Sequence, residues 1–397
     1  MGRFVGIRHR TKRTAEGEER PTQIFIINED GSSSSLNLAD DDSELDFVLG
    51  RHPVEYREAG EGEDLSGFLF RHIKQTKGRP NRVPSRYEGI VQGDIVAMAL
   101  GGSGDRMAFA LSRRGQEIGA RVYRITPFLL DEYRGGKKED DAKNIAFLAK
   151  TRLGLFSEVD VRDRALIAVR EAFRARIDAM KDRIACEQRL RQQIIGRVFL
   201  NQEGKYPEGS LEDAYDAEKA NDTILQALLQ EEGRRERELT SALGKIEVYE
   251  KVLKLVEGCG PMIAARLIAS IGDIRRFESD SKLKAFCGVH VLADGAFPRR
   301  RRNSVSNWHP EARQALYLLG EQFNRRPESL WGLKLREYKR KFREKHPEVV
   351  VVAGKKRYTD GHIHKMALWR TRTKFVEWLW REWRDLEEGR AAAEKAA

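Results

Sequence analysis

The segment from residue 160 to residue 256 constrains the fold more than any other part of the chain, because it is almost free of proline. Its first half carries apolar residues that step by four, three and four positions, which is the spacing of a heptad seam. These residues are Phe173, Ile177, Met180 and Ile184. The pattern predicts a long helix with one apolar stripe, which another helix must cover.

The stretch NQEGKYPEGS, residues 201–210, interrupts this helix with glycine and proline. Ser210, followed by Glu212 and Asp213, is a typical helix start, and a second helical segment follows to Val256. Its apolar residues are Ile224, Leu228, Leu239, Leu243 and Ile246. We predict two long helices in an antiparallel hairpin that pairs with a second subunit. The alternative is two ordinary core helices, although each segment is longer than most helices of globular proteins.

The N-terminal part of the chain has the pattern of an α/β domain. Short apolar runs predict strands at Phe4–Ile7, Gln23–Ile27, Ser34–Leu38, Ile95–Leu100 and Arg121–Thr126. Helices are predicted at Asp105–Arg114 and Lys138–Thr151, and the charged stretch Asp40–Asp64 is predicted to be loop with some helix. Strands followed by alternating β and α elements indicate a mixed sheet with helices packed on it.

From Glu257 onwards the chain is again predicted to be mainly helical. The helices are Pro261–Ile271, Ser279–Cys287, Pro310–Asn324, Pro327–Lys345 and His362–Trp383. The fold class is therefore α/β plus all-α. Three domains are predicted: residues 1–155, the coiled-coil helical hairpin of residues 156–256, and residues 257–397.

Charge indicates the class of partner. The net charge is +11 and the pI is about 9.5. Between Trp331 and Phe375 there are fourteen Lys or Arg against four Asp or Glu, which is the footprint of a polyanion-binding surface. The alternative is a solvated charged surface. A membrane is a poorer partner, because the basic residues do not lie on one amphipathic helix and no apolar run is long enough to span a bilayer.

The three cysteines, Cys186, Cys259 and Cys287, lie far apart and form no C-x-x-C pair. This argues against a disulfide framework and against a zinc ribbon. The N-terminal residues MGRFVGIRHRTKR contain no extended apolar segment and so predict no secretory signal. Together these features favour a reducing, cytoplasmic compartment.

The sequence VEGCGPMIAARLIASIGDI contains a glycine-flanked turn between two helical segments. Gly258 and Gly260 flank the turn, and Pro261 stands where a first helical residue would be. Glycines there let the backbone approach a partner closely, and free N–H groups at a helix start suit a phosphate. We predict that Gly258 and Gly260 contact a nucleic-acid backbone. The alternative is a tight helix–helix turn with purely structural glycines.

Basic and aromatic residues follow this turn. Four consecutive guanidinium groups, Arg299, Arg300, Arg301 and Arg302, cannot all be buried, so some face solvent or phosphates. Trp308 and His309 are predicted to stack on a base. Further predicted RNA- or DNA-binding residues are Lys355, Lys356, Arg357, Lys365, Arg370, Arg372 and Lys374. The pair His362 and His364 is a weaker candidate for metal binding, because no carboxylate or cysteine completes it, and no metal site is predicted.

The segment VEGCGPMIAARLIASIGDIRRFESDSKLKAFCGV resembles the C-terminal domain of the bridge-RNA-guided insertion-sequence transposases. It is also similar to the Nop domain of box C/D ribonucleoproteins, and to the Tas proteins of tandem-interspaced-guide-RNA (TIGR) systems. The resemblance implies an RNase H/RuvC-like N-terminal domain of the DEDD type and a Nop-like C-terminal domain. It also implies a guide RNA and target DNA as partners, a homodimer formed through the coiled coil, and a prokaryotic protein that joins the nucleoid when on DNA.

The DEDD carboxylates of that family are mostly replaced. Arg8 and His9 stand where the first aspartate is expected, and Leu100 and Gly101 where the glutamate is expected. Of the two last aspartates Asp141 fits, whereas Lys138 occupies the earlier position. A two-metal site needs several converging carboxylates, so the resemblance implies a degenerate domain. The alternative is a rearranged site made of Asp140, Asp105, Asp94 and His9.

The serine nucleophile of the transposases is also replaced. The resemblance places it where this chain has Asp294 and Gly295, and Ser304 and Ser306 lie downstream. We therefore expect no catalytic residues and no cofactor, with Mg²⁺ required only if a nuclease site is active. The favoured hypothesis is an RNA-guided DNA-binding protein. The alternatives are an active RuvC-type nuclease or transposase with a rearranged acidic site, and a structural ribonucleoprotein component that does not target DNA.

Replacing Arg299–Arg302 by alanine is expected to weaken RNA binding, because guanidinium groups on phosphates release counterions. The slope of log K against log salt should fall by roughly one for each phosphate that an arginine no longer neutralises. Filter binding over a range of NaCl concentrations measures it. An unchanged slope would place these arginines on solvated surface or in the protein core.

Overall fold

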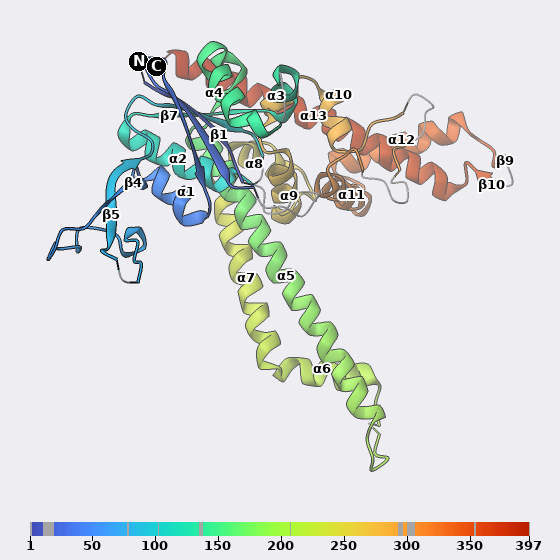
Figure 1. The fold of residues 1–397 in the computed structure, drawn as a ribbon. Coiled ribbons are helices and arrows are strands. Elements are labelled where there is room, and N and C mark those ends of the chain that lie inside the picture. Colours follow the sequence, from blue (N-terminus) through green and yellow to red (C-terminus); the bar gives the residue numbers. More distant parts are fainter. Residues whose placement is uncertain are drawn as a thin grey trace. The chain divides into compact units, whose positions relative to one another are not determined.

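The computed structural model describes residues 2–10, 20–77, 79–101, 103–134, 138–206, 208–292, 297–299, 306–352 and 355–396 (Figure 1). The chain divides into two compact units, Met1–Arg164 (unit 1) and Ala165–Ala397 (unit 2). Unit 1 holds a central sheet with helices, and unit 2 is mainly helical in its described part. The mixed α/β character predicted from the sequence is confirmed.

A six-stranded sheet forms the centre of unit 1, in the order β3-β2-β1-β6-β7-β8. Its strands are β1 (Phe4–Arg8), β2 (Thr22–Ile27), β3 (Ser33–Leu38), β6 (Ile95–Ala99), β7 (Arg121–Ile125) and β8 (Ser157–Glu158). β1, β6 and β7 run parallel, whereas β2, β3 and β8 are antiparallel to their neighbours. The five strands predicted from the sequence are therefore confirmed, and β8 is added to them.

The helices of unit 1 include the two predicted at 105–114 and 138–151, and one, Pro127–Tyr133, that was not predicted. They are α1 (Asp41–Val48), α2 (Asp105–Ile118), α3 (Pro127–Tyr133) and α4 (Asp141–Thr151), with short 3-10 turns η1 (Phe70–His72), η2 (Lys138–Asp140) and η3 (Leu153–Leu155). α2 ends at Gly119, whose φ of 81° favours glycine. The predicted helix from Lys138 to Thr151 is a 3-10 turn followed by α4.

α4 packs on β1, β2 and β6, and Gly6 makes this possible. A Cβ atom on Gly6 would lie 2.0 Å from the carbonyl oxygen of Ala142 and 2.5 Å from the amide nitrogen of Ala146. Only a residue without a side chain lets the helix backbone come so close to the strand. This packing fixes the first turn of α4, and with it Asp141, near the end of β1.

A second, two-stranded sheet pairs β4 (His52–Glu58) with β5 (Arg82–Glu88). These strands and the chain between them, residues 52–88, are called the arm. The arm forms a sheet apart from the six-stranded one (Figure 1). The sequence prediction of loop and helix for Asp40–Asp64 was thus right for α1 and wrong for β4. The partner strand of β4 is β5, which lies outside Asp40–Asp64. The sequence of Asp40–Asp64 alone therefore does not indicate that β4 is paired.

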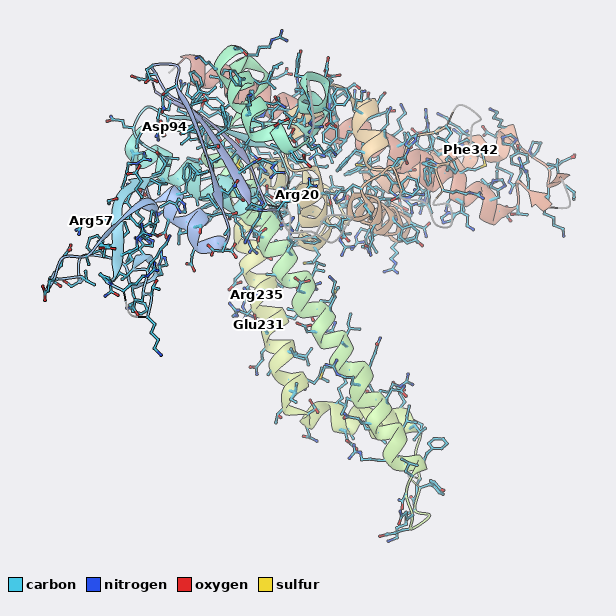
Figure 2. The ribbon with its side chains drawn as sticks, viewed as in Figure 1. Arg20, Arg57, Asp94, Glu231, Arg235 and Phe342 are labelled. Carbon is cyan, nitrogen blue, oxygen red and sulfur yellow. The ribbon has the colours of Figure 1, made fainter. Side chains whose placement is uncertain are left out.

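Two long helical segments of unit 2 lie side by side in Figure 1. They are α5 (Val161–Phe199), followed by α6 (Leu211–Asn221) and α7 (Thr223–Leu243). Ion pairs join Arg183 to Glu232 and, further along α5, Arg191 to Glu212. From the first pair to the second, the residue number rises on α5 and falls from α7 to α6. The two segments of the hairpin are therefore antiparallel, as predicted. Glu231 and Arg235 on α7 form a further ion pair (Figure 2).

The start of α6 confirms the predicted cap at Ser210. The Ser210 hydroxyl accepts from the amide of Asp213, and the Asp213 carboxylate accepts from the amide of Ser210, which is a complete capping box. The second segment is nevertheless not one helix to Val256. It bends at Asp222, which caps α7, and ends at Leu243.

The prediction of a buried seam position is wrong for two residues. Ile184 is 36% exposed and Ile224 is 66% exposed. The new start at Asp222 shifts the register of α7, so Leu225 is buried in place of Ile224. On α5 the ion-paired Arg183 lies beside Glu232, and the buried stripe continues through Ala179, Cys186, Leu190 and Ile194.

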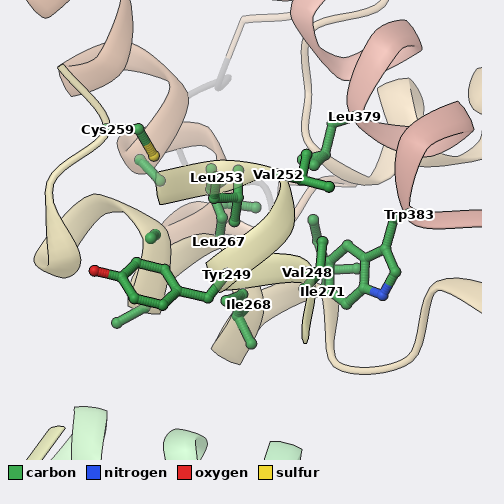
Figure 3. Close-up of a cluster of buried hydrophobic side chains, with 14 of the residues drawn as sticks. Val248, Tyr249, Val252, Leu253, Cys259, Leu267, Ile268, Ile271, Leu379 and Trp383 are labelled. Atoms are coloured by element: carbon green, nitrogen blue, oxygen red, sulfur yellow. The ribbon is translucent and has the colours of Figure 1, made fainter. Parts of the chain in front are cut away.

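The rest of unit 2 contains helices, short 3-10 turns and a β-hairpin in its described part. Its elements are α8 (Glu247–Lys251), η4 (Leu253–Leu255), α9 (Pro261–Ile271), η5 (Ile274–Arg276), α10 (Asp280–Phe286), α11 (Pro310–Arg325), α12 (Leu330–Lys345), β9 (Val350–Val352), β10 (Lys355–Arg357) and α13 (Asp360–Ala396). The five predicted helices are confirmed, and the β9–β10 hairpin is an addition. Leu267 and Ile271 of α9 pack with Leu379 and Trp383 of α13 in a common core (Figure 3). No helix in the described ranges has both the length and the apolar composition that a bilayer crossing needs.

Gly6→Ala is expected to destabilise unit 1 by about 1–3 kcal/mol, because the added methyl overpacks the boundary between β1 and α4. Amide hydrogen exchange of β1 and α4 measures the destabilisation. Unit 1 contains no tryptophan, so tryptophan fluorescence follows unit 2 alone. Gly67→Ala is the control, since no atom lies within 4 Å of its added Cβ. Equal protection in Gly6→Ala and the wild type would contradict the packing argument.

Candidate nucleic-acid interface

The carboxyl ends of the parallel strands β1, β6 and β7 meet at one edge of the sheet in unit 1. Arg8 ends β1 there, and Asp141 begins α4. Arg134 grips Asp141 with two hydrogen bonds, from Nε at 2.7 Å and from Nη2 at 2.9 Å. Asp141 raises the pKa of Arg134, so the guanidinium stays charged. The one carboxylate that fits the DEDD pattern is therefore already neutralised by an arginine.

Arg8 adds positive charge beside this pair. Burial lowers the pKa of Arg8, and the charge of Arg20 lowers it further, while Asp141 and Glu139 oppose the shift. The guanidinium groups of Arg8 and Arg134 repel a metal cation that approaches Asp141. The repulsion inferred from the sequence at Arg8 thus has a structural basis, and Arg134 strengthens it.

The other acidic candidates are paired in the same way. Asp105 is fully buried and accepts from Arg124 at 2.7 Å. Asp94 is held by Arg3, whose Nε and Nη2 lie 3.0 and 2.8 Å from its two oxygens (Figure 2). Asp94 precedes β6 and Asp105 follows its far end, so a strand of roughly 3.3 Å per residue separates them.

The remaining members of the alternative site do not complete it. His9 lies 3.4 Å from Glu44, and Asp140 is exposed in η2. Within the described ranges no three His, Cys, Asp or Glu side chains form a group that could hold a metal ion. The structure thus does not bring Asp140, Asp105, Asp94 and His9 together.

The glycine turn before α9 in unit 2 shows two different glycines. Gly258 has φ of 89°, and a Cβ there would lie 2.8 Å from the Cβ of Gln322 on α11. Backbone conformation and packing therefore account for Gly258 without a ligand. Gly260 caps α9, Pro261 takes the first helical position as predicted, and the space around Gly260 is open. Of the two glycines, Gly260 is the one that a phosphate can approach.

Arg299 is exposed and begins the arginine run, while the predictions for Arg300, Arg301 and Arg302, for Asp294 with Gly295, and for Ser304 lie outside the described residues. Arg313 on α11 organises the neighbouring aromatic side chains. Its guanidinium lies 4.2 Å from the ring centre of Trp308 and 5.3 Å from that of Trp369, and it donates to the carbonyl of Pro298 at 2.9 Å. Trp308 also packs against Gly288. The structure thus gives Trp308 intramolecular partners.

His309 has a structural task as well. Its side chain accepts from the amide of Ala312 and caps α11, and its ring stacks on Phe286 with centres 5.1 Å apart. Burial lowers the pKa of His309, and the nearby Arg276 lowers it further. The neutral ring is the form that accepts this hydrogen bond, so the cap is stable at neutral pH.

The basic residues of the β9–β10 hairpin and α13 divide into exposed and engaged groups. Lys356, Arg357, Lys365 and Arg370 are exposed, and the described part of the chain offers them no ion-pair partner. Lys374 pairs with Glu377, and Lys355 lies in β10. Figure 1 shows the hairpin at the far end of α12 from α11, whereas Phe297, two residues before Arg299, stacks on Trp369, next to Arg370, with ring centres 4.2 Å apart.

Arg372 is buried, which the sequence interpretation missed. Its guanidinium lies 4.9 Å from the ring centre of Tyr317, 3.6 Å from Glu321, and against Gly320 on α11. Burial lowers the pKa of Arg372. A signal was present, because Arg372 lies four residues after Leu368 and four before Val376 on the buried stripe of α13.

The histidine pair is engaged locally. His362 Nδ1 accepts from the amide of Tyr358 at 3.0 Å, and its ring is parallel to that of Tyr358. Burial lowers the pKa of His364. Sequence reasoning also missed Arg134, Arg124 and Arg313, and no local pattern distinguishes these arginines from those on the surface.

Residues 250–328 match the family described as Transposase IS116/IS110/IS902 family. The match begins in α8, covers α9, η5, α10 and α11, and ends just before α12. It supports a transposase relationship for this segment, and it carries no information on the TIGR-Tas proteins. No curated protein matches the chain.

Asp105→Ala is expected to destabilise unit 1 by about 3–5 kcal/mol, because it leaves the buried guanidinium of Arg124 without its carboxylate. The loss in the free energy of unfolding is measured by urea titration, with amide hydrogen exchange of β6 and β7 as the probe. The control is Glu55→Ala, which breaks an exposed pair with Arg86 and should cost less than about 1 kcal/mol. Similar costs for the two variants would contradict the structural importance of the buried pair.

Proposed function

We propose that this transposase-related chain is an RNA-guided DNA-binding protein whose N-terminal unit does not cut. The observation that carries the proposal is the two-bonded grip of Arg134 on Asp141. Asp141 is the one carboxylate that fits the DEDD resemblance, and a guanidinium binds it where a metal ion would be expected. In this proposal the sheet edge is a scaffold of RuvC type rather than a two-metal centre.

The electrostatics of the edge support this proposal. Phosphoryl transfer by two metals needs several carboxylates that face the same cations. Asp94, Asp105 and Asp141 instead bind Arg3, Arg124 and Arg134 in turn. Mg²⁺ also keeps strict octahedral geometry, and it would have to displace an arginine from a half-buried pair to gain one ligand.

The transposase-related segment supports nucleic-acid binding in unit 2. Its α9 start is open at Gly260, and Arg299, Lys356, Arg357, Lys365 and Arg370 are exposed nearby or on the following elements. Backbone contacts of this kind position a nucleic acid but carry no sequence information. We therefore assign sequence recognition to base pairing with a guide RNA, while the protein holds backbone and shape. In the proposal, target DNA is the second partner and a homodimer forms through the helical hairpin.

The RNA that copurifies with the full chain tests the proposal. Short RNAs of shared flanking sequence and variable core are expected, because a guide must vary to direct targeting. Long structured RNAs alone would favour a structural ribonucleoprotein component, and no RNA at all would refute RNA guidance.

The non-cutting scaffold has its own test. The chain is incubated with its bound RNA, a matched DNA duplex and Mg²⁺, and no cleavage is expected. Guide-dependent cleavage that disappears in Asp141→Ala would overturn the scaffold. Arg134→Gln serves as the matched variant, because it frees Asp141 while leaving the carboxylate in place.

A further inference from the structure

The arm of unit 1, residues 52–88, carries a basic surface that the proposed function does not use. Between Arg71 and Arg86 the chain has six Lys or Arg and no Asp or Glu. These residues are Arg71, Lys74, Lys77, Arg79, Arg82 and Arg86. The acidic residues of the arm are concentrated in its first part, between Glu55 and Asp64. The second part of the arm is therefore strongly basic.

The root of the arm is fixed by Asp46 on α1. The Asp46 carboxylate accepts from Arg51 at 2.9 Å, from Arg71 at 2.5 Å and from His72 at 2.6 Å. Burial alone would raise the pKa of Asp46, but these hydrogen bonds hold it at about 2. The carboxylate thus stays ionised at neutral pH. It compensates the charge of Arg71, which is therefore not counted among the unpaired cations of the arm.

Two acidic residues in the first part of the arm, Glu63 and Glu55, form ion pairs within the arm. Arg57 on β4 (Figure 2) binds both oxygens of Glu63, at 2.8 and 2.5 Å. Glu55 accepts from Arg86 at 2.8 Å. These ion pairs involve Arg57 and Arg86. They include none of the basic residues at the tip of the arm.

The tip begins where Lys74 and Arg82 face each other. Their backbones exchange two hydrogen bonds, of 2.9 and 3.0 Å, which close the narrow end of the ribbon. The Lys74 ammonium lies 3.7 Å from the ring centre of Tyr56, and the Arg82 guanidinium lies 6.0 Å from it. Lys77 and Arg79 lie beyond this bridge and are exposed.

Four cations at the tip form no ion pair in the described part of the chain, although Glu58 is the cross-strand neighbour of Arg82: Lys74, Lys77, Arg79 and Arg82. A cluster of like charges on a narrow ribbon is unfavourable in the free protein, and an external anion removes the repulsion. The bridge and the Tyr56 ring hold Lys74 and Arg82 in place, so these two side chains lose little freedom on binding.

We propose that the arm tip binds duplex DNA, with Lys74, Lys77, Arg79 and Arg82 on the phosphates that border the major groove. The inference rests on the proposed function for the presence of target DNA. A two-stranded ribbon fits the B-form major groove, which is about 12 Å wide. The A-form major groove of duplex RNA is deep and narrow and excludes such a ribbon. The shape of the arm therefore favours DNA over RNA.

The test uses the full chain with Lys77→Gln and Arg79→Gln combined. Anisotropy with a labelled DNA duplex, over a range of NaCl concentrations, gives the slope of log K against log salt. Taking two cations away from the phosphates should lower the slope by about 2. The matched control is Arg191→Gln with Lys205→Gln, which removes the same charge from exposed ion pairs at the far end of the helical hairpin. Its slope should equal that of the wild type.

Duplex and single-stranded RNA of the same sequence complete the experiment, and their slopes should not change. An unchanged DNA slope, no duplex binding by the wild type, or an equal change in the control overturns the proposal. An equal change on RNA overturns the assignment to DNA. Because the duplex test needs no guide, a chain that copurifies without RNA would refute RNA guidance and leave the result for the arm intact.

Discussion

The close approach of α4 to β1 at Gly6 is the constraint on which the geometry of unit 1 depends. It fixes Asp141 beside the end of β1, where Arg8 and Arg134 also lie. A larger residue at Gly6 would push the helix away and separate these groups. The packing of α4 on β1 thus brings the carboxylate of Asp141 to the guanidinium of Arg134.

Arginine has several structural tasks in this protein besides surface charge. Arg3, Arg124 and Arg134 hold buried or half-buried carboxylates in unit 1. In unit 2, Arg276 lies 4.7 Å from the ring centres of both Phe277 and Phe286, and its burial lowers its pKa to about 10. A planar, weakly hydrated guanidinium suits such positions better than an ammonium does. The excess of basic residues therefore overstates how much positive surface remains for a polyanion.

Sequence reasoning predicted the elements better than the site. The strands of the main sheet, the helix starts at Ser210 and Pro261, and the break at residues 201–210 follow from local patterns and are confirmed. Ile184 and Ile224 were wrong because one bend at Asp222 and one ion pair at Arg183 reset the register. Arg372 was counted as surface because its charge was judged without α11, which covers it.

The sequence by itself determined where the chain is helical or extended, because periodicity, caps and glycine conformations act over a few residues. It also identified Arg8, Leu100 and Lys138 as the residues that stand where the resemblance implies carboxylates. Only the tertiary structure decided which charges are paired. Arg3 and Asp94 are 91 positions apart, and Arg71 binds Asp46 across 25 positions. An ion pair over such a separation depends on distances across the fold, which local sequence does not contain.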